Sequence, residues 1–229
     1  MADNSITQGL IFAAAMVFAA ATFIIGLYQS GKRRKELTLW AFGKGLNISI
    51  SKDDSFDSKY LNFDCLQKGH SRYASNIMSG AIENRLFTGG DFHYTTGSGK
   101  NRTDHYFSFI IVKSPIWLKP LFIRPENFLD KIAELAGFND IDFESSEFSK
   151  KFYVKSTDKK WAYDIIHPRM MEYLLKSPVF SIQFDTLSVI IYRDRIFSTA
   201  DFEDSVKFVN GFFELIPEYV LQSQKLNPV

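Results

Sequence analysis

Residues 9–28, GLIFAAAMVFAAATFIIGLY, carry no charged side chain, and the basic run KRRK follows them at residues 32–35. Twenty helical residues extend about 30 Å, which is the thickness of the hydrocarbon core of a bilayer. Asp3 is the only charged residue before this stretch, and no small-x-small cleavage site follows it, so a retained anchor is favoured over a cleaved signal peptide. The sequence therefore predicts one transmembrane helix over residues 9–28, after a short tail at residues 1–8.

The charges beside the anchor predict its orientation. The flank before it has one acid and no bases, whereas residues 29–36 form a basic juxtamembrane segment. Because lysine and arginine are retained on the cytoplasmic side of a membrane, the chain from residue 32 onward is expected in the cytoplasm, with its anchor in the inner (plasma) membrane. The lipid bilayer is thus a predicted partner, through residues 9–28.

Small residues recur along the anchor at a spacing of four. The small-xxx-small pairs are Gly9–Ala13, Ala15–Ala19 and Thr22–Gly26. Such pairs let two helix backbones approach closely, so self-association or binding of a membrane-protein partner is one interpretation. The other interpretation is that alanine is simply common in anchors, and the sequence leaves both open.

Residues 37–229 have the composition of a single folded domain. The chain contains 23 Phe and 10 Tyr, which favours a large core with much β-structure. Cys65 is the only cysteine, so an intramolecular disulfide and a cysteine-based metal site are excluded. The domain carries 23 Lys and Arg against 24 Asp and Glu, and without a basic excess no nucleic-acid partner is expected.

Strand-like and helix-like segments follow one another without regular βαβ alternation, which predicts a mixed α+β domain behind the transmembrane helix. The first expected strands are residues 46–51, a strand entered through 76–80, and residues 86–94 with a bulge or bend at Gly89-Gly90. The others are residues 105–113, 121–124, 140–143, 152–155, 179–184 and 187–192, the last two as a hairpin. The expected helices are Glu36–Lys44 with Gly45 as its stop, Pro125–Ala136, a helix capped by Ser156 or Thr157, one from Pro168 to Lys176, and one capped by Ser198-Thr199 and interrupted by Pro217.

The segment TTGSGKNRT, Thr95–Thr103, is predicted to be a glycine-rich hairpin loop between two strong strands. Hydroxyls, flexible backbone N–H groups and cations together are the ingredients of an anion-binding concavity, suited to a lipid headgroup, a phosphorylated ligand or an acidic peptide. The alternative is a mobile, solvated turn. The candidate ligand-binding residues are Thr95, Thr96, Gly97, Ser98, Gly99, Lys100 and Arg102.

A nucleotide-binding phosphate loop is excluded at this segment. Tyr94 stands where that motif needs its first glycine, and Asn101 replaces the hydroxyl that would bind magnesium. The motif also requires a helix after the loop, whereas a strand is expected here. The glycines are therefore better explained by a turn.

Two sets of residues are weaker candidates for a metal site. His93 and His105 are equidistant from Gly99, so a symmetric hairpin would place them opposite each other, but no third ligand is evident. Asp140, Asp142 and Glu144 alternate along a predicted strand and would share one face, without the glycine of a calcium loop. A structural histidine pair and a solvated acidic face are favoured, so no metal and no cofactor are predicted.

Three segments resemble a known family: NIMSG at residues 76–80, DFHYTTGSGKN at 91–101 and IDFES at 141–145. They are similar to a family of uncharacterised prokaryotic membrane-anchored proteins that have a membrane segment, a basic stop and a domain of unknown function. The similarity covers most of the chain from about Leu37, and YTTGSGK is its most specific part. The resemblance implies membrane association and a prokaryotic source, and it supplies no activity.

The sequence favours a non-enzymatic binding or scaffold module at the inner face of the membrane. It contains no Gly-x-Ser-x-Gly elbow, and no catalytic residue can be assigned. The alternative is an enzyme of unknown type that acts on a membrane-proximal substrate, which a pocket of convergent polar groups would favour. Because the predicted core lies after Glu36, a chain that begins there is expected to fold without the anchor.

Overall fold

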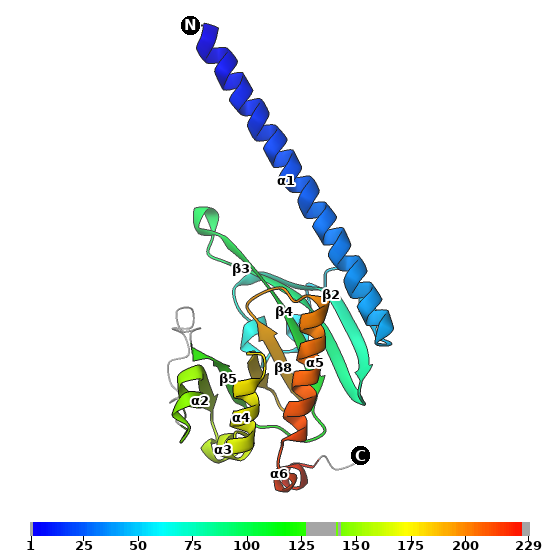
Figure 1. The fold of residues 1–229 in the computed structure, drawn as a ribbon, viewed down its shortest axis with the longest axis vertical. Helices are drawn as coiled ribbons and strands as arrows, with labels where there is room; N and C mark the ends of the chain where they lie inside the picture. The colour runs from blue at the N-terminus through cyan, green and yellow to red at the C-terminus, as the bar shows by residue number, and fades with distance from the viewer. Residues whose placement is uncertain (1, 127–140, 142, 226–229) are drawn as a thin grey trace.

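The computed structural model describes residues 2–126, 141 and 143–225, and its longest element is the helix α1, Ala2–Gly43 (Figure 1). The anchor, the juxtamembrane segment and the helix expected over Glu36–Lys44 are one continuous helix of 42 residues, not separate elements. Lys, Arg and Glu dominate the stretch between anchor and domain, and these residues favour a helix. The helix of the anchor therefore continues through the juxtamembrane segment into the domain.

The end of α1 is a Schellman motif, as the glycine after it predicted. The N–H of Leu46 donates to the carbonyl of Ala41 (2.8 Å), and Gly45, at φ +71°, donates to the carbonyl of Phe42 (3.0 Å). Leu37 and Ala41 are buried in the domain, whereas the side chains of residues 12–26 are exposed. The helix therefore has a free part and a part that belongs to the domain core.

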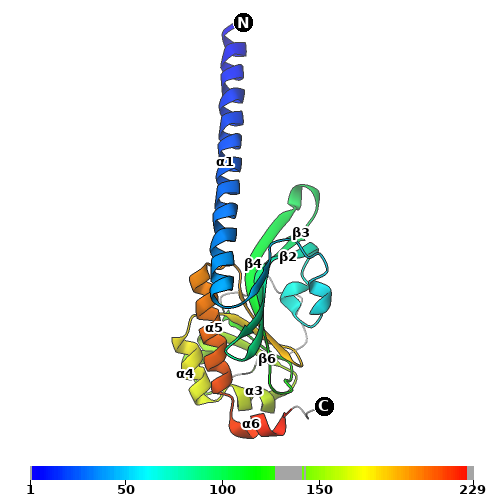
Figure 2. The same ribbon diagram turned by 90° about the vertical axis from the view of Figure 1, so that its right-hand side faces the viewer.

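The free part of α1 projects from the domain in both views (Figures 1 and 2). By length and composition, α1 is long and apolar enough to cross a membrane. Within residues 2–126, 141 and 143–225, it is the one helix with this property. The chain thus combines one candidate membrane span with a folded domain.

The domain is built on one antiparallel sheet of eight strands in the order β1-β2-β3-β4-β8-β7-β5-β6. Its strands are β1 (Asn47–Ser49), β2 (His70–Ile82), β3 (Arg85–Thr96), β4 (Thr103–Lys113), β5 (Leu121–Pro125), β6 (Phe152–Ser156), β7 (Ser181–Phe184) and β8 (Ser188–Arg193). The strand predicted at residues 105–113 is β4, which lies between β3 and β8 and is central, as expected. The predicted α+β class is confirmed.

The helices gather on one face of the sheet (Figure 2). They are the C-terminal part of α1, together with α2 (Ser146–Lys151), α3 (Lys159–Ile165), α4 (Pro168–Lys176), α5 (Thr199–Glu214) and α6 (Glu218–Ser223). Between them and the sheet lies the larger core, with Phe180, Phe197, Phe202 and Phe212 fully buried. Burial of each large side chain contributes about 1.5–3 kcal/mol, so this layer dominates the stability of the domain.

A smaller core lies on the opposite face of the sheet. Two short 3-10 turns, η1 (Asp57–Lys59) and η2 (Asp64–Leu66), cover that face beside Phe92 and Phe109. Cys65 is buried in this cluster, and burial raises the pKa of its thiol far above the ordinary value. The thiol is therefore protonated and shielded at neutral pH.

The bulge expected at Gly89-Gly90 lies instead on the facing strand. The β2–β3 register shifts between Ser75 and Met78, and Asn76 has φ +51°. A Cβ at Gly90 would lie 3.0 Å from the carbonyl oxygen of Ser75, so the glycine leaves room for the bulged backbone of β2. Gly90 therefore does mark an irregularity in the sheet, but it does so because the bulged strand β2 approaches it closely.

Several local predictions are confirmed. The β7–β8 hairpin turns at Asp185-Thr186, Pro168 begins α4, and Ser198 caps α5, which ends before Pro217. The cap of α3 is different: the side chain of Asp158 accepts from the N–H of Trp161, whereas Ser156 bonds the carbonyl of Pro120. Pro125, predicted to begin a helix through Ala136, is the last residue of β5. The part of that predicted helix from residue 127 onward lies outside the described residues, and so do Asp140 and Asp142 of the predicted strand.

Asp201 closes the N-terminus of α5 and should make the domain sensitive to acid. It forms a reciprocal capping box with Ser198, and hydrogen bonding from Arg195 holds the pKa of Asp201 well below its unfolded value near 3.8. Because the folded pKa is depressed, this stabilisation is complete above pH 4 and is lost as the pH falls below it. We expect Asp201→Asn to lower the free energy of unfolding by about 1–2 kcal/mol at pH 7, and by less as the pH falls toward 2.

The measurement is denaturant unfolding of the parent and the variant across this pH range. Asp204→Asn is the matched control, because Asp204 is exposed on the same helix and should change the free energy by about 0.5 kcal/mol or less. An Asp201→Asn effect that stays constant down to pH 2 would contradict the assignment.

Candidate functional site

Polar side chains line one face of β3 and β4 where these central strands approach their hairpin. Alternate residues of a strand point to the same face. On β3 these residues are Asp91, His93 and Thr95, and their neighbours on β4 are Ser108, Tyr106 and Asp104. The same face is apolar at the other end of the strands, where α1 and α5 cover it. The polar part of the face is therefore the first place to search for a site.

The polar face begins at an ion pair with α1. Nη2 of Arg33 lies 2.7 Å from Oδ1 of Asp91 and 2.9 Å from its Oδ2, and Nε of Arg33 lies 3.2 Å from Oδ2. The Asp91 side chain is only 9% exposed, and that of Arg33 is 25% exposed. A charged pair with this geometry and burial joins the candidate span directly to the central strands.

Further hydrogen bonds satisfy both partners of this pair. Asn76 donates its amide to Oδ2 of Asp91 (2.8 Å), and Ser108 donates its hydroxyl to Oδ1. Arg33 also donates to the carbonyl of Phe197, whose own N–H donates to the Ser108 hydroxyl (2.8 Å). We call these five residues the junction network. It holds α1, three strands of the sheet and the segment before α5 in one arrangement.

Beyond the junction network, the polar face opens into a cleft of about 450 Å³ at the base of the β3–β4 hairpin. The residues that line this hairpin cleft are Lys52, Asp54, Ser71, Arg72, Tyr73, His93, Arg102, Asp104 and Tyr106. They come from β2, β3, β4, the hairpin residue just before β4 and the segment after β1. The cleft combines cations, carboxylates and two phenols, which suits the recognition of a polar ligand.

His93 forms the floor of the hairpin cleft. Its ring lies between those of Tyr73 and Tyr106, at centroid distances of 4.5 and 4.7 Å. Nδ1 lies 3.1 Å from the carbonyl oxygen of Ser71, and Nε2 lies 3.3 Å from Oδ1 of Asp104. Both ring nitrogens are engaged, so His93 is held as a fixed part of the floor.

The groups at the rim have defined protonation states. Hydrogen bonding from Thr95, followed by Arg102, lowers the pKa of Asp104 below its ordinary value. Burial and the neighbouring Tyr73 raise the pKa of Tyr106. At neutral pH the cleft therefore offers a carboxylate acceptor at Asp104 and a hydroxyl donor at Tyr106, while the ammonium of Lys52 lies 3.9 Å from the centre of the Tyr73 ring.

The predicted ligand-binding loop is a hairpin tip, but its residues do not act as one set. Thr95 is fully buried and donates its hydroxyl to Asp104 (2.7 Å), and Thr96 bonds His105 (2.7 Å). Arg102 is paired with Asp104 at 3.1 Å and lines the hairpin cleft. A short 3-10 turn, η3 (Gly99–Asn101), is followed by β4, so the turn that replaced the phosphate-loop interpretation is confirmed.

The outer part of the tip is exposed. Gly97 and Gly99 have φ of +68° and +57°, which explains the two glycines, and Nε2 of His70 lies 3.0 Å from the carbonyl oxygen of Gly97. The side chains of Ser98 and Lys100 make no hydrogen bond or ion pair with the described part of the chain. Ser98 and Lys100 are therefore the predicted site residues whose side chains remain available to a ligand.

The predicted histidine pair is wrong. His93 pairs with Tyr106 and His105 pairs with Tyr94, so the two histidines lie on opposite faces of the sheet. The hairpin loop has an even number of residues, and its centre falls between Gly99 and Lys100. In the described ranges, no three His, Cys, Asp or Glu side chains are placed to hold a metal ion. Glu144, from the predicted acidic face, is exposed.

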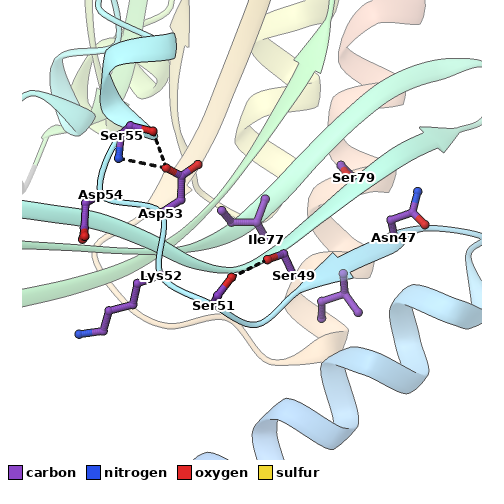
Figure 3. Close-up of a pocket in the computed structure, with 10 residues that line it drawn as sticks. Asn47, Ser49, Ser51, Lys52, Asp53, Asp54, Ser55, Ile77 and Ser79 are labelled. Atoms are coloured by element: carbon purple, nitrogen blue, oxygen red, sulfur yellow. Dashed lines mark hydrogen bonds between the residues drawn. The ribbon is translucent and has the colours of Figure 1, made fainter.

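A second groove, of about 660 Å³, lies along the edge strand β1 (Figure 3). Its polar groups bond one another: Ser49 and Ser51 share a hydrogen bond of 3.0 Å, and Ser55 donates to Asp53 at 2.7 Å. Lys59, followed by Ser55, lowers the pKa of Asp53. Lys52 and Asp54 line both grooves, but the hairpin cleft has the buried histidine and the phenols, so it is the stronger candidate.

The fold and the site define this chain as an antiparallel α+β domain carried on one helix that could span a membrane. No protein-family model matches the sequence, and a search of curated proteins finds no match. Among solved structures, the chain is similar to the mycobacterial trehalose monomycolate transport factor A, TtfA, with a TM-score of 0.61 and 13% sequence identity. The match covers 87% of this chain and 98% of that chain, and at this identity it shows a shared fold alone.

The junction network generates a stability prediction. Arg33→Leu leaves the buried Asp91 carboxylate without its cation, so we expect the free energy of unfolding to fall by about 3 kcal/mol. Arg34→Leu is the matched control, because Arg34 is exposed and should change it by about 0.5 kcal/mol or less. Adding Asp91→Asn to Arg33→Leu should recover part of the loss, because the isolated charge is removed.

These free energies are measured by denaturant titration of the full chain in mild detergent. Equal losses for Arg33→Leu and Arg34→Leu would show that the ion pair does not stabilise the domain.

The ion pair also changes the expectation for a chain that begins at Glu36, which was expected to fold without the anchor. Such a chain lacks Arg33, so it should be less stable than one that begins at Gln29, by a similar amount.

Proposed function

We propose that this chain is a single-pass protein of the inner (plasma) membrane, whose cytoplasmic domain is a non-enzymatic binding module. The continuity of α1 carries the proposal. The helix runs without a break from an exposed apolar segment to buried residues of the domain core, and Arg33 ties it to Asp91. A span built in this way holds the domain at a fixed distance from the bilayer. Such an arrangement suits a module that presents a binding surface near the membrane.

The hairpin cleft is the proposed binding surface. It is open and polar, and its aromatic walls are held in place by His93, on which the Tyr73 ring stacks and the Tyr106 ring packs at a tilt. Catalysis by His93 would require it to release either the carbonyl of Ser71 or the carboxylate of Asp104. Recognition needs no such change, which favours a binding module over an enzyme. The similarity in fold to a transport factor supports an accessory role of this kind.

The orientation is tested with a reporter fused after Val229, which should be active only in the cytoplasm. Replacing the exposed bases Lys32, Arg34 and Lys35 with Gln should weaken the orientation, because these bases supply the positive-inside bias while Arg33 is kept for the fold. The control replaces the exposed Lys113, Lys159 and Lys160 with Gln, which changes the net charge equally but leaves the flank of the span intact. Reporter activity on the outer side of the membrane in the parent chain would overturn the proposal.

The binding role is tested by purifying the full chain from membranes in mild detergent and identifying what co-purifies. We expect the combined Lys52→Ala and Tyr106→Ala variant to lose most of that ligand, because one cation and one phenol of the hairpin cleft are removed. Tyr219→Ala is the control, since Tyr219 is comparably exposed on α6. Equal recovery of the ligand in all three chains would exclude the cleft as its site.

A further inference from the structure

The helix α1 and the β3–β4 hairpin leave the junction network in the same direction. Arg33 and Asp91 clamp the two elements together at one point. From there, α1 continues toward its N-terminus and β3 continues toward the hairpin tip. Figures 1 and 2 both show the tip and the N-terminal half of α1 extending from the domain toward the same side. The tip is therefore on the side where the candidate span lies.

The two elements differ in how far they reach from the clamp. The polar end of the span, Tyr28, is five helical residues from Arg33, which corresponds to about 7–8 Å along the axis. Gly97 is six strand residues from Asp91, which corresponds to about 20 Å. The strand therefore reaches the level of Tyr28 unless it is inclined to the helix by more than roughly 65°. In both figures the hairpin extends from the domain to the same side as the N-terminal half of α1. A bilayer that begins at Tyr28 meets the hairpin tip.

The tip has the chemistry of a surface contact. Gly97–Arg102 is GSGKNR, which contains two cations and no apolar side chain. Such a segment interacts with headgroups and does not enter the acyl chains. Lys32, Arg34 and Lys35 are exposed on α1 beside the same boundary, so cations surround it from both elements. The cytoplasmic leaflet carries anionic lipids that attract such residues.

The base of the tip is fixed, so its position follows that of the domain. Thr95 is buried and bonded to Asp104, and the carbonyl of Gly97 is bonded to His70. Gly69 packs so closely on Thr95 that a Cβ there would lie 2.1 Å from the Thr95 oxygen. A tip held in this way cannot fold back from the membrane without disturbing the hairpin cleft.

We propose that the β3–β4 hairpin tip is a second membrane contact, at which Lys100 binds the phosphate groups of anionic lipids in the leaflet where α1 emerges. This inference rests on the proposed membrane span. Together the span and the tip form a two-point attachment that fixes the tilt of the domain. The hairpin cleft, which lies directly below the tip, is thereby presented to the lipid surface.

The test uses the full chain in nanodiscs, with a fluorophore on Ser98→Cys and a spin label on the lipid headgroup as quencher. Cys65 is buried with a raised thiol pKa, so the label goes to position 98 alone, and the unlabelled parent verifies this. Discs of phosphatidylcholine are compared with discs that also contain phosphatidylglycerol. We expect most of the emission to be quenched in the anionic discs and little in the neutral ones. A spin label deep in the acyl chains should quench neither.

Two controls separate position from charge. A fluorophore on Gln222→Cys, at the opposite end of the domain on α6, should be quenched in neither disc (Figure 1). Lys100→Glu should remove most of the quenching at position 98 in the anionic discs. Lys113→Glu, the same change at the remote end of β4, should leave it intact.

Each other outcome counts against the inference. If the chain stays with the discs but position 98 is quenched no more than position 222, the span holds and the tip does not reach the membrane, which leaves the tip to a protein partner. If quenching does not depend on phosphatidylglycerol or on Lys100, the contact is not the proposed anionic one. If the chain does not remain with the discs, the proposed membrane span itself fails, and the inference fails with it.

Discussion

The arrangement of this molecule depends on one ion pair, between Arg33 and Asp91. A carboxylate in the middle of a central strand would be costly if it were unpaired, and here a guanidinium, an amide and a hydroxyl all bond to it. The guanidinium comes from the element that could span a membrane, so the pair joins this helix to the central strands of the sheet. Leu37 and Ala41 extend the attachment by one and two turns, and the Schellman motif at Gly45 then turns the chain into β1.

The polar face of β3 and β4 connects the junction network to the candidate binding site. Asp91, His93 and Thr95 are consecutive residues on one side of β3, and they belong in turn to the junction network, the hairpin cleft and the base of the tip. One face of a single strand therefore connects the helix, the cleft and the tip.

Much of the fold could be predicted from the sequence, because its signals are local. Pro168, Ser198 and Gly45 act within one turn of a helix, and they begin or end the expected elements. The predictions that failed depend on contacts between residues that lie farther apart in the sequence. The register of His93 and His105 follows from the number of residues in the loop, and a change of one moves a side chain to the other face of the sheet.

The site was only partly foreseen, for the same reason. The tip was identified from its glycines and cations, whereas the burial of Thr95 depends on Asp104 across the hairpin. Arg33 was assigned to the basic flank of the anchor, and its partner is 58 residues away. One signal was present: Arg33 stands four residues before Leu37 and eight before Ala41, on the face of the helix that the domain covers.

The unbroken course of α1 also sets the direction in which the domain faces around the helix axis. Thr22 and Trp40 are 18 residues apart, about five full turns of α1, so their side chains point in the same direction around the helix axis. Trp40 packs on Phe202 and Lys44 pairs with Glu203, so this direction is the one that the domain occupies. A second copy that docked through the Thr22–Gly26 pair would bring its own domain into the same space. Inserting a single residue near Gly31 would turn the domain by about 100° relative to the small-residue face.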